Sequence, residues 1–214
     1  MRNQKKTVEV ILFDLGNVVL PFNHYPIAEK LSRWTQNKEF QDPQKIFSFL
    51  FDFQKGIIND FDIGKLSPQE FFHTIQKHLD LSIPYEEFIL IWNDIFIEDH
   101  EVSQIILSLK GKWRLGLLSN TDPLHFHYIL STFPILQTFD RRILSYEVGF
   151  KKPAFEIYQK AIQWASVNPE KILLIDDIKK YVEVAISLGM QGIHFTSSAH
   201  LKKELHKKLG IKVE

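Results

Sequence analysis

The sequence predicts an α/β fold, a doubly wound and mainly parallel sheet with an all-helical segment inserted after the first strand. Two observations predict it. Short, nearly continuous apolar runs alternate with amphipathic stretches near residue 10 and again after residue 100, which is typical of strands buried on both faces of a parallel sheet. Between residues 22 and 100 this alternation stops and only helical patterns follow one another. Such an insertion would form a cap over the sheet.

Five apolar runs are the predicted strands. They cover residues 8–13, 113–118, 142–144, 172–175 and 192–195. The helices expected between and after the later strands cover residues 124–130, 155–165, 181–188 and 199–209. In the second of these helices, Phe155, Tyr158 and Ile162 recur at intervals of three and four residues, which gives one face to bury. Alternation of strands and helices predicts the doubly wound sheet.

The insertion is predicted to contain four helices. They cover residues 27–34, 44–53, 68–79 and 85–95. The third has a clear start, because Ser67 can cap it, Pro68 suits its first position and Glu70 can complete a capping box. Aromatic and aliphatic residues share one face of these helices, so we expect a small bundle. We divide the chain into a catalytic α/β domain of residues 1–21 and 101–214 and a helical cap domain of residues 22–100.

Composition restricts the class of protein. With 44% hydrophobic residues, 18 Phe and no Cys among 214 residues, the chain can fold around a sizeable core without disulfides. The formal net charge of zero argues against a nucleic-acid partner, which would select a basic surface. No apolar run approaches the roughly 18–20 residues of a membrane span, and no signal peptide is recognisable. We expect a cytoplasmic protein without a membrane partner, as a monomer or weak homodimer.

The zero net charge is unevenly distributed. Residues 22–100 carry 7 basic and 13 acidic side chains, a net charge of −6. Residues 101–214 carry 16 basic and 11 acidic side chains, a net charge of +5, and residues 1–21 add +1. Opposite charges on the two predicted domains would favour closure of the cap, provided that these charges face one another.

Polar side chains follow the predicted strands where ligands bind in open α/β sheets, at the carboxyl ends. They are Asp14, Ser119, Asn120, Lys152, Asp176 and Asp177. Each alone is commonly a turn or helix-start residue, but their shared position on one edge indicates a site. Three carboxylates repel one another unless a cation lies among them. Since only oxygen ligands are offered, Mg²⁺ is the expected cofactor.

At these positions the chain resembles the haloacid dehalogenase superfamily. The matching motifs are FDLGNV at residues 13–18, LSN at 118–120, KP at 152–153 and IDD at 175–177. Their order is that of members with a Rossmann-like sheet and a helical cap after the first motif. Residues 61–71, FDIGKLSPQEF, resemble a helix entry common in these caps. The first loop and residues 119–121 are most similar to bacterial sugar-phosphate phosphatases of the type that acts on glucose 1-phosphate.

The resemblance implies magnesium-dependent hydrolysis of a small phosphorylated metabolite. Asp14 would attack phosphorus and form an aspartyl-phosphate. Ser119 and Asn120 would bind the phosphoryl group. Lys152 would stabilise the transition state with its positive charge, and Lys151 is the alternative candidate for that role.

The resemblance also implies which groups hold the metal. Mg²⁺ would be bound by Asp14, by the backbone carbonyl of Gly16 and by Asp177, while Asp176 would act through water.

Two positions depart from the family pattern. Gly16 stands where most phosphatases of the family have an Asp that protonates the leaving oxygen, and losing such a group costs about 10²–10⁴-fold in rate. Tyr181 replaces an Asn of the metal loop. Two alternatives therefore stay open, a metal-free 2-haloacid dehalogenase and a non-catalytic phospho-ligand-binding protein. We expect His125 and His127, two residues apart, to have structural roles, although His125 lies soon enough after Ser119 to reach the substrate.

Overall fold

The computed structural model describes residues 7–210 and contains one five-stranded, all-parallel sheet in the order β3-β2-β1-β4-β5. The strands are β1 (Val10–Phe13), β2 (Arg114–Ser119), β3 (Arg141–Leu144), β4 (Ile172–Asp176) and β5 (Gln191–His194). Phe13 pairs with Leu117 on one side and with Ile175 on the other, so the carboxyl ends of the three central strands lie level. The predicted doubly wound parallel sheet is confirmed.

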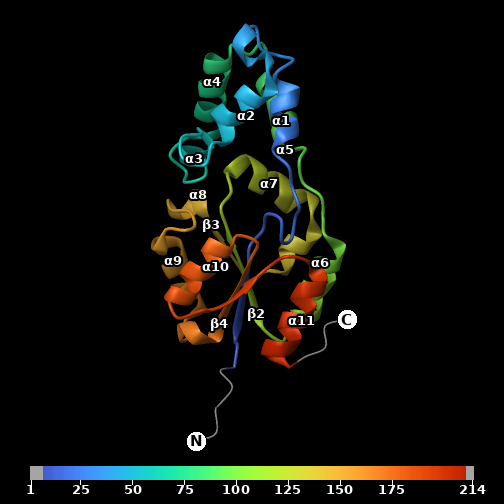
Figure 1. Cartoon of the computed structure of the whole chain (residues 1–214), viewed down its shortest axis with the longest axis vertical. Helices are drawn as coiled ribbons and strands as arrows, with labels where there is room; N and C mark the ends of the chain where they lie inside the picture. The colour runs from blue at the N-terminus through green and yellow to red at the C-terminus, as the bar shows by residue number, and fades with distance from the viewer. Residues whose placement is uncertain (1–6, 211–214) are drawn as a thin grey trace, which may run out of the picture.

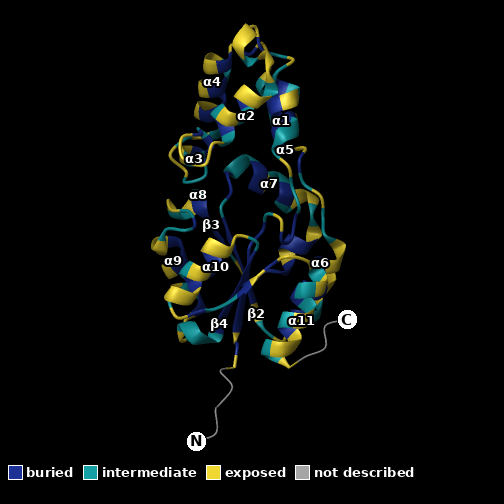
Figure 2. Cartoon of the chain, viewed as in Figure 1, coloured by how far each residue is buried: buried dark blue, intermediate teal, exposed yellow. Residues whose placement is uncertain are grey.

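Helices cover both faces of this sheet (Figure 1). One face packs against α6 (His100–Leu109), α7 (Pro123–Thr132) and α11 (Ser198–Leu209), and the other against α9 (Phe155–Ala165) and α10 (Lys179–Ser187). Successive residues of β1 alternate between the two cores, Ile11 in one and Val10 in the other, and both are fully buried. This two-sided burial, visible in Figure 2, explains why the strands are continuously apolar.

All named elements between β1 and α6 are helices, as predicted, and they lie beyond one end of the sheet (Figure 1). The α-helices are α1 (Tyr25–Leu31), α2 (Pro43–Phe51), α3 (Ile58–Phe61), α4 (Pro68–Leu79) and α5 (Tyr85–Asn93). We call α1–α5 the helical bundle. Its core is rich in aromatic rings, and those of Phe61 and Phe71 stack with centroids 4.0 Å apart. The predicted capping box of Ser67 and Glu70 is present at the start of α4.

The structure differs from the sequence prediction mainly in short elements. The bounds of α4 and α9 agree, but α3, α6 and α8 (Ser145–Val148) were not predicted, nor were the 3₁₀ turns η1 (Lys38–Gln41), η2 (Pro134–Thr138) and η3 (Pro169–Lys171). Four-residue helices such as α3 and α8 are too short to show a periodicity. The longest helices, α4 and α11, have 12 residues each, and none within residues 7–210 could cross a membrane.

We call the sheet and the helices that cover its two faces, together with α8, the sheet unit, and the turn between α3 and α4 approaches it closely. Gly64 adopts a φ of +71°, and a Cβ there would lie 2.3 Å from the carbonyl oxygen of Tyr146 in α8. Because a side chain cannot fit, this approach requires glycine. The contact brings the end of α3 over the loop that follows α8.

Candidate active site

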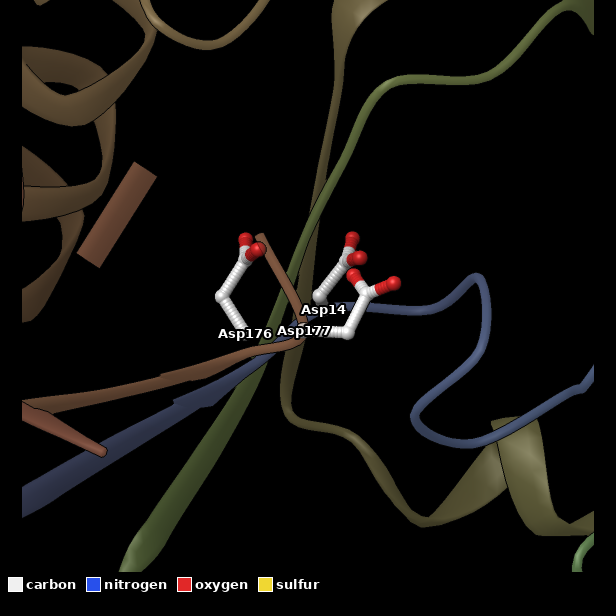
Figure 3. Close-up of side chains that lie close together, drawn as sticks. All are labelled: Asp14, Asp176 and Asp177. Atoms are coloured by element: carbon white, nitrogen blue, oxygen red, sulfur yellow. The ribbon is translucent and has the colours of Figure 1, made fainter. Parts of the chain in front are cut away.

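Three carboxylates meet at the carboxyl edge of the sheet. Asp14 follows β1, Asp176 ends β4 and Asp177 comes next. One carboxylate oxygen from each lies within 4.8 Å of those of the other two, and Figure 3 shows the three carboxyl groups on the same side of the strand ends. The level register of β1 and β4 brings them together, since it places Phe13 beside Ile175.

The Lys152 ammonium group lies among these carboxylates. Its side chain is 1% exposed, and Nζ donates to Asp14 Oδ1 at 2.7 Å and to Asp176 Oδ2 at 2.6 Å. Burial alone would lower the pKa of Lys152, but the two carboxylates outweigh it and hold the pKa above its usual value. With three carboxylates and one ammonium group, the cluster carries a formal charge of −2 when all are ionised.

The three carboxylates are not equivalent. Asp176 is fully buried, and both its oxygens have protein partners, Lys152 on Oδ2 and the Ile178 amide on Oδ1 at 2.9 Å. Asp14 and Asp177 instead line a cavity. Burial is the main reason that the pKa of Asp14 rises to about 7, with Lys152 opposing it, and burial followed by Asp176 raises the pKa of Asp177.

Ser119 and Asn120 lie where β2 ends. Ser119 is 1% exposed, lines the cavity and donates to the Asn120 carbonyl at 3.3 Å. Asn120 holds the backbone of Lys152 at both polar atoms, donating to its carbonyl at 2.9 Å and accepting from its amide at 2.7 Å. The Asn120 side chain therefore positions the loop that carries Lys152.

Gly16 also lines the cavity, but with no room for a side chain. A Cβ at this position would lie 2.5 Å from Cε1 of Phe22. The Phe22 ring, which packs against His24 and Phe96, occupies the space that a residue other than glycine would need. Where the sequence resemblance leads us to expect an acidic side chain, the space is thus taken by the Phe22 ring.

The cavity has a volume of about 220 Å³ and lies between the sheet edge and the helical bundle. Besides the residues above, its wall includes His24, Phe51, Phe53, Ile58, Asn59, Asp62, Phe96, Asp122, His125, Lys151, Ile178 and Tyr181. This volume is below the roughly 300–1,000 Å³ of pockets for drug-sized ligands. A small ligand fits best.

A buried pair of Asp122 and His125 lines the cavity and was not predicted as functional. His125 Nδ1 lies 2.6 Å from Asp122 Oδ2, and Nε2 lies 2.9 Å from the Trp92 carbonyl of α5. Burial would raise the pKa of Asp122, but its contacts with His125 and Trp92 hold it below the usual value. Asp122 also caps α7 by accepting from the His125 amide, so an acidic residue three positions before a histidine at a helix start was an available signal.

The bundle-side wall holds a second polar cluster. Lys151 Nζ lies 3.4 Å from Asp62 Oδ2 and also donates to Asn59 Oδ1. Burial raises the pKa of Asp62 to about 7 against the opposing effect of Lys151. The two adjacent lysines thus face different groups, Lys152 the carboxylates and Lys151 the bundle.

His24 lies in the same wall. Its ring stacks on Phe51 with centroids 4.3 Å apart, and its pKa falls to about 3 through burial and, secondarily, His125.

The donor set fits a hard divalent cation. Its three carboxylates are oxygen donors, and the net charge with Lys152 is −2. Asp14 and Asp177 line the cavity together with Gly16. Mg²⁺ favours few carboxylates and oxygen ligands throughout. Within residues 7–210, no thiolate or histidine joins the cluster.

Comparison with known proteins agrees with this geometry. A family model for haloacid dehalogenase-like hydrolases matches residues 8–189. The D-ribitol-5-phosphate phosphatase of Bacteroides thetaiotaomicron is 30% identical over 159 residues, which span 71% of this chain and 77% of that protein.

Solved structures share the fold. A haloacid dehalogenase family enzyme from Bacteroides thetaiotaomicron superposes with a TM-score of 0.77 at 25% identity, over 89% of this chain and 94% of that one. A structure of that enzyme with magnesium and inorganic phosphate gives a TM-score of 0.77 at 24% identity, over 91% and 98%. An L-2-haloacid dehalogenase from Xanthobacter autotrophicus gives 0.61 at 15% identity, over 94% and 83%.

Proposed function

The chain belongs to the haloacid dehalogenase-like hydrolase family, and we propose that it hydrolyses a small phosphomonoester in a magnesium-dependent reaction. The enzyme class predicted from the sequence, a phosphatase of this family, is confirmed. The observation that carries the proposal is the cluster of Asp14, Asp177 and Lys152 in the wall of a small cavity.

Asp14 is the proposed nucleophile. Its backbone amide donates to the Ile175 carbonyl at 2.8 Å, and Lys152 holds Oδ1, so the carboxylate is fixed at the cavity wall. Attack of Asp14 on phosphorus would form an aspartyl-phosphate, and water would then hydrolyse it. Lys152 favours the ionised carboxylate and so opposes the effect of burial on the Asp14 pKa.

Asp14, Asp177 and the Gly16 carbonyl are the proposed direct ligands of magnesium, and Asp176 supports them from behind through Lys152 and the Ile178 amide. When bound, the cation would neutralise phosphoryl oxygens and reduce their repulsion of an anionic nucleophile.

Ser119 and Lys152 are the proposed phosphoryl-binding groups. The Ser119 hydroxyl lines the cavity at the end of β2. The positive charge of the Lys152 ammonium group stabilises the phosphoryl group more strongly as negative charge develops in the transition state. Asn120, which we expect to bind substrate, lines the cavity and has both its amide atoms bonded to the Lys152 backbone. We therefore propose a positioning role for Asn120.

We propose that residues 22–100 act as a cap domain and that residues 1–21 and 101–214 form the catalytic domain. The cavity supports this division, because its wall combines residues of both parts. The volume of about 220 Å³ favours a small sugar or polyol phosphate over a nucleotide, and the bacterial relative is a D-ribitol-5-phosphate phosphatase. A metal-free dehalogenase is disfavoured, since it has no need for the third carboxylate.

Phosphate release from a panel of sugar, polyol, nucleotide and aryl phosphates tests the proposal. The wild-type enzyme should require Mg²⁺, and Asp14→Asn should abolish release. Asp60→Asn, at an exposed position of α3, is the control and should leave release intact. Equal release by wild type and Asp14→Asn would falsify the proposal.

A readout that does not need turnover accompanies this test. Mg²⁺ should raise the melting temperature of the wild type, because a cation bound to the folded cluster stabilises it. Asp177→Asn should reduce that shift, whereas Asp60→Asn should not. An undiminished shift in Asp177→Asn would remove Asp177 from the metal site.

A further inference from the structure

We propose that Asp62, held by Lys151 on the bundle side of the cavity, is the proton donor to the leaving oxygen, the role that residue 16 cannot fill in this chain. This inference rests on the proposed phosphatase function. It assigns a catalytic group to the residue that follows helix α3 of the bundle rather than to the loop after β1. The case has three parts: the need for a donor, the exclusion of other groups, and the environment of Asp62.

The need arises at Gly16. An alkoxide is a poor leaving group, and a positioned acid typically accelerates its departure by about 10²–10⁴-fold. Gly16 has no side chain, and Phe22 fills the neighbouring space, with a ring carbon 2.5 Å from where a Cβ would be. A donor for an alkyl phosphate must therefore come from another part of the cavity wall.

Most ionisable groups of the cavity wall already have another role or partner. Asp14, Asp177 and Lys152 belong to the carboxylate cluster. Asp122 is bonded to His125 and Trp92, and its pKa lies below the usual range, so it stays ionised.

Three further groups are unsuited to donate a proton to the leaving oxygen. His24 has a pKa of about 3 and is neutral, and Tyr181 has a pKa of about 12 because it is buried near carboxylates. Both ring nitrogens of His125 lie against protein groups, Nδ1 against Asp122 Oδ2 and Nε2 against the Trp92 carbonyl, so the ring offers neither nitrogen to the leaving oxygen. Among the ionisable groups of the described wall, Asp62 and its partner Lys151 are left.

Asp62 has the environment that a general acid needs. Asp62 is the residue that follows α3. Its side chain is 16% exposed, so it is largely shielded from water. The charged groups that act on it are Lys151, Asp122 and His125, and burial outweighs Lys151 to give a pKa of about 7. An acid whose pKa is near the working pH is the most effective in both directions.

Asp62 lines the same cavity as Asp14, Ser119 and Lys152. Its charge contributes to the raised pKa of Tyr181, as do the charges of Asp14 and Asp176. The Lys152 ammonium group lies 5.2 Å from the centre of the Tyr181 ring. Because Lys151 precedes Lys152 in the chain, one short loop joins the Asp62 cluster to the carboxylate cluster.

The proton balance of the two steps is complete. In the first step Asp14 forms a bond to phosphorus, the phosphorus–oxygen bond of the ester breaks, and the Asp62 carboxyl gives its proton to the departing oxygen. The resulting Asp62 carboxylate is stabilised by Lys151. In the second step water attacks phosphorus, Asp62 accepts the proton, and the bond to Asp14 breaks to release inorganic phosphate.

Substrates that differ in leaving group test the proposal. We expect Asp62→Asn to lower kcat/KM for glycerol phosphate by about 10²–10³-fold, because an alkoxide needs the proton. The ratio of kcat/KM for 4-nitrophenyl phosphate to that for glycerol phosphate should rise by a similar factor of about 10²-fold, since nitrophenolate leaves without protonation.

Asn59→Ala is the matched control. It removes the other partner of Lys151 in the same cluster but no proton donor. If Asp62 only holds the bundle against the sheet unit, Asp62→Asn and Asn59→Ala should each lower kcat/KM for the two substrates by the same factor. The ratio of the two kcat/KM values would then stay unchanged. That result in Asp62→Asn would overturn the proposal.

The pH profile adds a readout that a structural role would not change. For glycerol phosphate, wild-type kcat/KM should fall as pH rises above about 7, as Asp62 loses its proton. This limb should be absent in Asp62→Asn. Lys151→Met should move it to higher pH, because loss of a cation favours the protonated carboxyl. An unchanged limb in Asp62→Asn would overturn the proposal while Asp14-dependent release would still support the phosphatase function.

Discussion

The two walls of the cavity hold their charged groups in different ways. At the sheet edge, Lys152 is 1% exposed and makes two short ion pairs to residues at strand ends. On the bundle side, Lys151 is 25% exposed and lies 3.4 Å from Asp62, which follows the four-residue helix α3. The first wall is fixed by the register of the sheet, whereas the second depends on how the bundle meets it. This difference suits a fixed phosphoryl site and an adjustable leaving-group site.

The two adjacent lysines provide the strongest test of this comparison. Lys152→Met leaves Asp14 and Asp176 as unpaired buried carboxylates, so it should cost about 3–5 kcal/mol of unfolding free energy. It should also reduce kcat by about 10²–10³-fold through loss of transition-state charge stabilisation. Urea unfolding and steady-state kinetics measure the two effects.

Lys151→Met is the matched control, since it removes the same charge one residue away. Its half-buried contact with Asp62 should contribute about 1 kcal/mol or less to stability. Equal losses of stability in the two variants would show that the walls are equally rigid and would break the comparison.

The pH dependence of the unfolding free energy tests whether His24 is buried in the bundle-side wall. The folded pKa of His24 is about 3, below the ordinary value of 6.5, so the unfolded chain binds more protons between these pH values. The contribution of His24 is complete above pH 6.5 and is lost as pH falls toward 3, with a slope of up to about 1.4 kcal/mol per pH unit.

Replacing His24 by Phe should remove this dependence while keeping an aromatic contact with Phe51. Urea unfolding at several pH values between 4 and 7 gives the difference between wild type and variant, in which other titrating groups cancel. A difference that does not change with pH would mean that His24 is not buried in its neutral form.

Parts of the site were predictable because local sequence determines them. Asp14, Ser119 and Asp176 end apolar runs, and the parallel register then brings their strand ends to one edge. The distinction between Lys152 and Lys151 came from the motif that places a proline next. Tertiary packing alone reveals Asp62, because nothing in residues 58–62 indicates that they meet Lys151.

The fold shows the same division. The strands are recognisable as continuous apolar runs, and the long helices α4 and α9 have clear apolar periodicity. Helix α6 was missed although Val102, Ile105, Ile106 and Leu109 form a buried face. Its start beside Asp99 lay too close to the expected domain boundary to be read as part of the sheet unit.

Gly16→Asp tests whether an acidic side chain at the sheet edge can protonate the leaving oxygen in this chain. Alone, the substitution should cost about 1–3 kcal/mol, because its Cβ collides with the Phe22 ring. The double variant Gly16→Asp with Phe22→Leu should recover part of that stability and raise kcat/KM for glycerol phosphate more than for 4-nitrophenyl phosphate. Equal increases for both substrates would show that protonation of the leaving group is not the limiting deficiency.

The smallest expected effect concerns the scaffold of the bundle-side wall. In α4, the Ser67 hydroxyl accepts from the Glu70 amide, and the Glu70 carboxylate accepts from the Ser67 amide at 2.8 Å. Ser67→Ala removes one half of this capping box and should cost about 1 kcal/mol of unfolding free energy. Since α4 positions no group of the cavity wall directly, kcat/KM should keep its ratio between the two test substrates. A changed ratio would mean that the bundle transmits small losses of stability to Asp62, and the bundle-side wall would then be less independent of its scaffold than the sheet edge.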